Sequence, residues 1–126
     1  MRTAAVVMTK NVVRINGDAT VAKAILSMRY KDVSSLVVNP RTGEDEYGIV
    51  IRLDIMKKVV AEKRDPSDLL VRDIMSKPAI CVSPDSPLCD CAILMARAKT
   101  TRVLVLDAEE LVGMVSSTDV FNTPCW

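Results

Sequence analysis

The sequence contains no histidine, few aromatic residues and no long apolar run, and each of these absences removes a class of function. Without histidine, the chain lacks the side chain that proteins use most often as a general base and as a metal ligand. Aromatic residues make up 3% of the chain, too few for the stacking surfaces that bind single-stranded nucleic acid. No segment reaches the roughly 18 apolar residues that a transmembrane helix needs, so we expect no membrane partner.

The charge balance and the first residues bear on partners and location. The formal net charge is +1, without the basic excess typical of nucleic-acid-binding domains, so we expect no nucleic-acid partner. The apolar run within residues 1–10 is shorter than that of a secretory signal peptide. The cytoplasm is therefore the expected location.

Four cysteines lie in the second half of the chain: Cys81, Cys89, Cys91 and Cys125. Their spacing is that neither of a disulfide framework nor of a zinc site, where CxxC pairs are usual. Residues two apart, such as Cys89 and Cys91, do not face each other on a helix. We expect no metal site, and we expect Cys91 to fill a small apolar position in the core. The roles of the four thiols stay open.

An apolar fraction of 49% in 126 residues is enough for one domain with a core of its own. Because aromatic residues are scarce, that core must be built from aliphatic side chains. Such a composition is typical of folded chains and not of disordered ones.

An internal repeat organises the chain. The segment Met8-Thr9-Lys10 recurs as Met75-Ser76-Lys77, and from position 8 to position 75 the offset is 67 residues. After the middle of each copy the offset falls to 65, from position 48 to position 113, where glycine pairs with glycine. The two extra residues of the first copy lie within residues 39–46, where proline, glycine and charged residues predict a turn.

Each copy predicts the same order of elements, β-α-β-β-α. The predicted strands are residues 12–15, 36–38 and 47–51 in the first copy, and 79–82, 103–106 and 111–115 in the second. Between the first two strands, apolar residues recur at i, i+3, i+4 and i+7 from Val21 and from Leu88, which predicts a helix. A closing helix covers residues 52–62 and, in shorter form, a segment that ends near Phe121.

The predicted fold class is therefore α/β (α+β), with two pseudo-symmetric units in one chain. Residues 63–68 form a polar linker, and we divide the chain into residues 1–66 and 67–126. One copy of about 60 residues has a marginal core by itself. We expect the two copies to pack as one pair that covers both sheets.

The second copy also carries short motifs in a fixed order. Residues 71–75 (VRDIM) with Pro78 open the copy, residues 85–88 (DSPL) begin its helix, and residues 105–107 (VLD) lead to residues 111–119 (LVGMVSSTD). In this ordered and duplicated form the chain resembles the CBS family over nearly its whole length, and the first copy is the more divergent. It is identified as a stand-alone tandem pair of CBS motifs.

The resemblance implies a function. In this family, two motifs form a pair with two clefts, which often bind adenosine compounds such as AMP, ATP or S-adenosylmethionine, and the pairs commonly form disc-shaped dimers. It implies a regulatory, energy-sensing module that binds AMP, ADP, ATP or another adenosyl compound, requires no cofactor and is not an enzyme. Which adenosyl compound binds, whether both clefts bind and which protein lies downstream stay open.

The family's ligand motif is glycine, two apolar residues, serine or threonine, two variable residues and aspartate. The second copy matches it at Gly113, Ser116 and Asp119, and Thr118 adds a hydroxyl beside the aspartate. Glycine permits the close approach of a backbone or a ligand. A carboxylate accepts two hydrogen bonds, which suits the two hydroxyls of a ribose. Arg102 stands where the family often has a basic residue near the phosphates.

The first copy departs from this pattern. It keeps Gly48 and Asp54, but Ile51 replaces the hydroxyl, and Ser35 stands at the position of the basic residue. Arg52 offers a different phosphate contact. Because the hydroxyl and the basic residue are missing from the first copy, we expect the ligand to prefer the site of the second copy. The expected ligand-binding residues are Asp119, Ser116, Thr118, Gly113, Arg102, Ile80, Asp54, Arg52 and Gly48.

Other interpretations stay open at this point. Asp54 and Asp119 would also stabilise the dipole of a helix from its first turn. Ser116 is equally suited to cap that helix, and Arg102 to lie on a solvated surface. At the level of function, the alternatives are a structural dimerisation module without ligand and a thiol redox sensor.

Residues 88–98 predict self-association. At 100° per residue, Ile93 and Leu94 flank the one charged stripe of this helix, away from its core face. A helix that is apolar nearly all round is normally buried on more than one side, and twofold pairing is the commonest way to cover such a face. We expect a homodimer with Ile93 or Leu94 at or near the contact, unless the short last helix or residues 121–126 cover them within one chain.

Overall fold

The computed structural model describes residues 2–124, which divide into two compact units. The first-repeat unit is residues 13–79, and the second-repeat unit combines residues 2–12 with residues 80–124. Within the described residues, no helix is long and apolar enough to cross a membrane. Cys125 lies outside the described residues.

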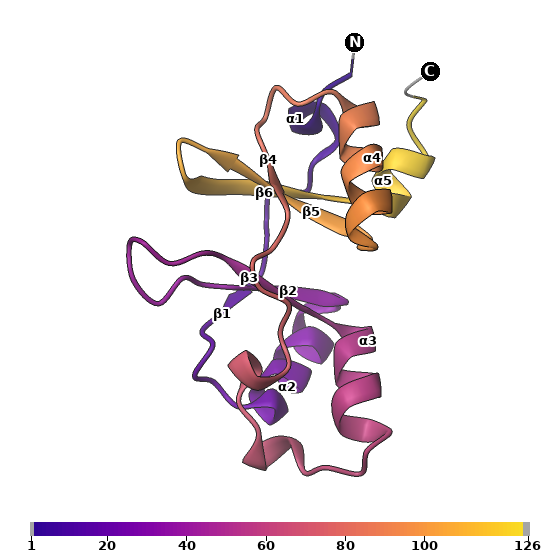
Figure 1. The fold of residues 1–126 in the computed structure, drawn as a ribbon. Helices are drawn as coiled ribbons and strands as arrows, with labels where there is room; N and C mark the ends of the chain where they lie inside the picture. The colour runs from indigo at the N-terminus through magenta and orange to yellow at the C-terminus, as the bar shows by residue number, and fades with distance from the viewer. Residues whose placement is uncertain (1, 125–126) are drawn as a thin grey trace. The chain divides into compact units, whose positions relative to one another are not determined.

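The first-repeat unit is built on a three-stranded sheet of order β1-β2-β3, with β1 parallel to β2 and β2 antiparallel to β3 (Figure 1). Its elements are β1 (Arg14–Ile15), α2 (Val21–Lys31), β2 (Ser35–Val38), β3 (Gly48–Ile51), α3 (Arg52–Ile55), a π-helix (Met56–Val60) and two 3₁₀ turns (Pro66–Asp68, Val71–Asp73). The helix predicted over residues 52–62 is confirmed, although its second half is wound as a π-helix.

The second-repeat unit repeats this plan with the sheet order β4-β5-β6 and the same strand directions. Its elements are α1 (Ala4–Val7), β4 (Cys81–Val82), α4 (Leu88–Ala98), β5 (Arg102–Asp107), β6 (Glu110–Ser116) and α5 (Ser117–Phe121). The predicted β-α-β-β-α order is thus confirmed in both copies, as is the short closing helix of the second. Helix α1 was not predicted, because four residues are too few for periodicity to show.

Local sequence explains where the two long helices begin and end. The Thr20 hydroxyl accepts a hydrogen bond from the Lys23 N–H at 3.1 Å and so caps the start of α2. Helix α4 begins directly after Pro87. Both helices end on a left-handed residue, Asp32 with φ 54° and Lys99 with φ 55°. In both units the left-handed residue ends the helix, and the chain then turns into the central strand of the sheet.

Each unit has its own aliphatic core, as the composition predicted. In the first-repeat unit, Leu36 and Val50 from the sheet pack with Val21, Ile55 and Ile74. The core of the second-repeat unit is built from Ala4, Leu88, Cys91, Met95, Val103, Val105 and Val115. The expectation that Cys91 fills a core position is confirmed, and burial raises the pKa of its thiol, with the charge of Asp90 adding to the effect.

The segment that opens each sequence copy packs in the unit of the other copy. In the second-repeat unit, Thr9 bridges to Met114 of β6 through two backbone hydrogen bonds of 2.9 and 3.0 Å. In the first-repeat unit, Ser76 bridges to Ile49 of β3 in the same way. The compact units in space are therefore divided differently from the sequence copies 1–66 and 67–126.

Candidate functional site

The turn from β6 into α5 is held by a reciprocal pair of side-chain hydrogen bonds. The Asp119 N–H donates to Ser116 Oγ at 3.2 Å, and the Ser116 N–H donates to Asp119 Oδ2 at 2.8 Å. The Ser116 hydroxyl also donates to Asp119 Oδ2 at 2.9 Å. This capping box fixes the aspartate at the edge of the sheet and shows that Ser116 is the helix cap.

The two oxygens of Asp119 differ in what they can still bind. Oδ2 already accepts two hydrogen bonds from Ser116, whereas Oδ1 makes no hydrogen bond or ion pair with the rest of the described chain. The Ser116 hydroxyl has given its only hydrogen to Asp119, so it can offer a ligand no donor. The hydroxyl of Thr118 is exposed and makes no side-chain hydrogen bond within the described residues. A ligand would therefore meet one free carboxylate oxygen and the Thr118 hydroxyl.

Arg102 and Ile80 lie at the same end of this sheet as Ser116. Arg102, the first residue of β5, pairs directly with Ser116, the last residue of β6. Its guanidinium donates to Thr101 Oγ1 at 3.0 Å. The Ile80 carbonyl, just before β4, accepts from the Leu104 N–H at 2.8 Å, and the Ile80 side chain is partly buried against the core. The sheet thus brings together the basic, apolar and acidic residues that the second copy was expected to contribute.

Gly113 has a structural role in β6. A Cβ built on this glycine would lie 2.5 Å from Met8 Sδ and 3.0 Å from the Thr9 carbonyl oxygen. Gly48 is its counterpart in β3, where a Cβ would lie 2.9 Å from Met75 Sδ and 3.2 Å from a backbone oxygen. Each glycine therefore makes room for the opening segment that packs across it within its own unit.

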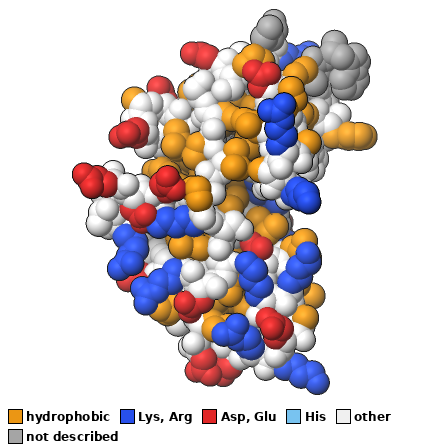
Figure 2. Space-filling view, in the orientation of Figure 1, with side chains coloured by type: hydrophobic (Ala, Val, Ile, Leu, Met, Phe, Trp, Pro, Cys, Tyr) orange, Lys and Arg blue, Asp and Glu red, His pale blue; other side chains and the backbone are white. Residues whose placement is uncertain are grey.

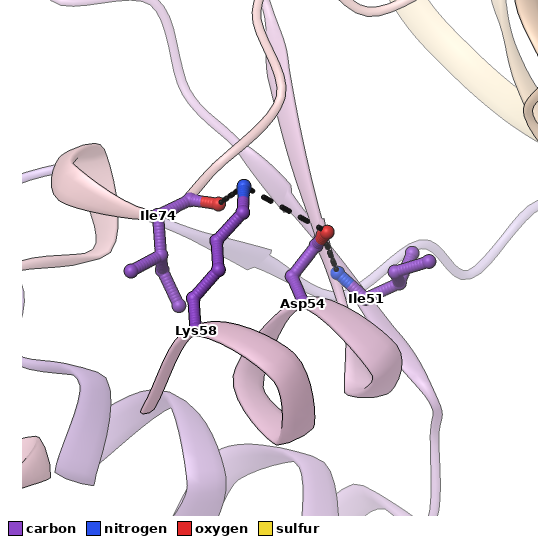
Figure 3. A network of polar contacts seen from close by, with 4 residues as sticks. All are labelled: Ile51, Asp54, Lys58 and Ile74. Carbon is purple, nitrogen blue, oxygen red and sulfur yellow. Dashed lines mark hydrogen bonds and ion pairs between the residues drawn. The ribbon is translucent and has the colours of Figure 1, made fainter. Parts of the chain in front are cut away.

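The equivalent turn of the first-repeat unit has different side-chain contacts (Figure 3). Asp54 Oδ2 accepts from the Ile51 N–H at 3.0 Å, but Ile51 has no hydroxyl to return the bond. Lys58, one helical turn later, lies 4.0 Å from Asp54 Oδ1 and donates to the Ile74 carbonyl at 2.9 Å. Arg52 is exposed, and Ser35, which pairs with Ile51, is buried.

Lys58 is a difference between the two turns that the sequence did not lead us to expect. Its ammonium lies near Asp54 Oδ1, the counterpart of the Asp119 oxygen that has no partner in the described chain. The spacing of four residues between Asp54 and Lys58 is the usual signal of a helical ion pair and could have indicated it. At the same offset the second copy has Thr123, which carries no charge.

The described residues beside these turns form no metal-binding cluster. Among residues 2–124, no three potential ligands of the Cys, Asp and Glu types are grouped closely enough to hold a metal ion. The face drawn in Figure 2 mixes basic and acidic side chains and shows no uniform basic field. What remains is a small polar constellation suited to hydrogen-bonding a neutral hydroxyl or an anionic group.

Two β-α-β-β-α repeats, each with a glycine-containing strand that runs into an aspartate-bearing helix, define a class of small modules built as tandem pairs. The family model described as "CBS domain" matches this chain twice, over residues 4–61 and 71–123. The chain therefore belongs to the CBS domain family.

Solved structures of CBS proteins are similar to this chain. The hexameric CBS-CP12 protein from bloom-forming cyanobacteria is 38% identical with a TM-score of 0.93, over 98% of this chain and 71% of that chain. A CBS domain protein from Pyrobaculum aerophilum complexed with AMP shares the fold, at 23% identity and a TM-score of 0.82, over 94% of this chain and 89% of that chain. An uncharacterized protein from Methanopyrus kandleri is 29% identical over 118 residues, which is 92% of this chain and 59% of the relative. The chain spans between 22% and 62% of the curated relatives it matches.

Proposed function

We propose that this CBS pair is a regulatory module that binds an adenine nucleotide at the β6–α5 turn of the second-repeat unit. The observation that carries the proposal is Asp119 Oδ1, an acceptor held rigidly by the capping box and left without a partner in the described chain. A ribose presents hydroxyl donors, and a single carboxylate oxygen has two lone pairs for them. Thr118 supplies a further polar contact.

Neighbouring residues suit the other parts of a nucleotide. Arg102 begins the adjacent strand, and a guanidinium is the side chain best matched to phosphate oxygens. Ile80 offers a partly buried aliphatic surface against which a base can pack. The Pyrobaculum aerophilum protein, which is similar in fold, was solved with AMP, and this makes AMP the first ligand to test.

Regulation would follow from differential affinity. A ligand shifts a conformational equilibrium only by as much as it binds one state better than the other. The proposal is therefore for a module that reports nucleotide level to a protein partner, without chemistry of its own. A dimerisation module without ligand is the competing function, and it predicts that nucleotides have no effect on either stability or assembly.

The test uses isothermal titration of the full chain with AMP, ADP, ATP and S-adenosylmethionine, beside 2′,3′-dideoxyadenosine monophosphate. We expect at least one adenosyl ligand to bind, and loss of the ribose hydroxyls to weaken its binding. We expect Asp119→Asn to bind the adenosyl ligand more weakly. This variant retains an acceptor for the Ser116 N–H, so the turn stays capped while the charge is lost. Absence of binding by every adenosyl ligand would contradict the proposal and leave the ligand-free dimerisation module and the thiol redox sensor as the alternatives.

A further inference from the structure

A polar pocket lies at the opposite end of the first-repeat sheet from Asp54. It has a volume of about 310 Å³, and it is lined by Asn16, Gly17, Asp18, Asn39, Pro40, Arg41 and Arg72. Asn16 follows the end of β1 and Asn39 follows the end of β2, whereas Asp54 follows the end of antiparallel β3. The pocket and the β3–α3 turn that carries Asp54 therefore lie at opposite ends of this sheet.

Backbone contacts bring the two arginines to this pocket. The Arg72 N–H donates to the Gly17 carbonyl at 2.9 Å, and a Cβ on Gly17 would lie 3.4 Å from Arg72 Cβ. The Arg41 N–H donates to Asp45 Oδ2 at 2.9 Å, and Asp45 is paired with Lys77 at 2.6 Å. On the face drawn in Figure 2, basic and acidic side chains gather at this β2–β3 loop. The loop is therefore tied to the same 63–79 segment that supplies Arg72.

The polar side chains of the pocket have unused capacity. Within residues 2–124, the guanidinium groups of Arg41 and Arg72 and the carboxylate of Asp18 make no hydrogen bond or ion pair. The Asn39 amide donates to Asn16 Oδ1 at 3.0 Å, while Asn39 Oδ1 is buried without a partner in the described chain. Rotating both amides by 180° keeps one hydrogen bond and still leaves one amide group unpaired.

The second-repeat unit provides an internal comparison, because its equivalent position carries no cation. There the Ala5 N–H donates to the Pro84 carbonyl at 3.0 Å, in the place of Arg72 and Gly17. The turn equivalent to the Arg41 loop is residues 107–110, which are Asp, Ala, Glu and Glu. The paired arginines are therefore specific to the first repeat, and Arg41 lies in the segment that holds its two extra residues.

We propose that this pocket is a binding site for a small phosphorylated sugar or polyol. A phosphate dianion matches two guanidinium groups, which bind it through charge-assisted hydrogen bonds. Asp18 opposes a ligand that carries negative charge alone, but its carboxylate accepts hydrogen bonds from hydroxyls. Pockets for small molecules begin at roughly 300 Å³, which is the size class of this one. The ligand therefore combines one phosphate with several hydroxyls.

The experiment is a titration of the full ¹⁵N-labelled chain with ribose 5-phosphate, followed by amide chemical shifts. We expect saturable shifts at Gly17, Arg72 and Arg41, a weaker response to inorganic phosphate and none to ribose. Arg72→Gln and Arg41→Gln keep the backbone bonds and should each weaken binding by about tenfold or more, the loss typical of one bond to a charged group. Arg29→Gln makes the same charge change on α2 outside the pocket and should bind as the wild type does.

The outcomes separate this site from the nucleotide site. Asp119→Asn should leave the ribose 5-phosphate shifts at Gly17, Arg41 and Arg72 unchanged, since Asp119 belongs to the other unit. Equal affinity for ribose 5-phosphate in the Arg41→Gln and Arg29→Gln variants, both folded by their spectra, would overturn the proposal. So would saturable shifts confined to the β6–α5 turn, because the phosphate would then be binding at the nucleotide site.

Discussion

At the scale of single residues, the two motif aspartates show how one motif yields two chemical environments. Asp119 is capped by Ser116 and keeps one oxygen free of the described chain, whereas Asp54 faces Lys58. The motif in the sequence specifies the aspartate and its turn. The charge beside the aspartate depends on the residue four positions later, which the motif does not include.

Replacing Asp119 tests the residue that carries the proposed function. We expect Asp119→Ala to weaken adenine-nucleotide binding by roughly 1.5–3 kcal/mol, the range for hydrogen bonds to a charged group. Asp54→Ala is the matched change in the other repeat and should have a smaller effect. Calorimetry measures both affinities, and unchanged affinity in Asp119→Ala would reduce this aspartate to a residue that caps its helix.

Replacing the motif glycines tests their structural role. Gly113→Ala should destabilise the chain by about 1–3 kcal/mol, because the new Cβ meets Met8 and the rigid backbone oxygen of Thr9. Gly43→Ala is the control, since nothing lies within 4 Å of its Cβ position, and it should be neutral or stabilising by up to about 1 kcal/mol. Urea denaturation gives both free energies of unfolding. Equal values would show that Met8 and Thr9 shift to accommodate the new Cβ at little cost in free energy.

The Asp45–Lys77 pair should give a pH-dependent contribution to stability. The hydrogen bond from Lys77, together with backbone hydrogen bonds from Arg41 and Glu46, lowers the pKa of Asp45 from 3.8 to about 2. A depressed carboxyl pKa means that the contribution is present above pH 3.8 and is lost as the pH falls toward 2. Lys77→Gln should therefore lower the melting temperature at pH 6, and the gap from the wild type should close as the pH falls from about 4 to 2. A gap that is constant with pH would show that the ion pair does not stabilise the loop.

At the scale of elements, periodicity predicted the helices and strands whose formation depends on residues close together in the sequence. Helices α2 and α4 follow from apolar residues at helical spacing, and the strands follow from short aliphatic runs between turns. The π-helix at Met56–Val60 and the short α1 were not predicted, because they add no residue pattern of their own. The pocket could not be predicted from the sequence either, since Arg72 and Asn16 are far apart in the chain and come together only in the folded structure.

The two strand-to-helix turns should bind nucleotide unequally. Lys58 faces Asp54, and Ile51 and Ser35 replace the hydroxyl and the basic residue of the other turn. A calorimetric titration with the adenosyl ligand should therefore give one dominant site per chain. Lys58→Met should strengthen any weaker second site, while two equal and independent sites in the wild type would contradict the assignment.

At the scale of the whole chain, the repeat offset could not show which unit each opening segment joins. Residues 8–10 and 75–77 are 67 positions apart whether each packs on its own copy or on the other, so the sequence pattern is the same in both cases. The contacts Thr9–Met114 and Ile49–Ser76 decide it. Each compact unit depends on residues from both sequence copies, so removing residues 1–12 should damage the second-repeat unit first.

Self-association is the remaining prediction for the whole molecule, and the structure sharpens it. Leu94 packs partly against the core of its own unit, whereas Ile93 is 47% exposed and Phe121 on α5 is 85% exposed. Helix α5 thus leaves Ile93 open to a partner, and exposed apolar patches commonly mark contacts between subunits. We expect light scattering to give a mass about twice the 13.8 kDa of one chain. Ile93→Glu should give a folded monomer, while Val6→Glu, which adds the same charge at an exposed apolar position of α1, should remain dimeric. A wild-type monomer at micromolar concentration would contradict the homodimer, and a dimeric Ile93→Glu variant would place its contact elsewhere.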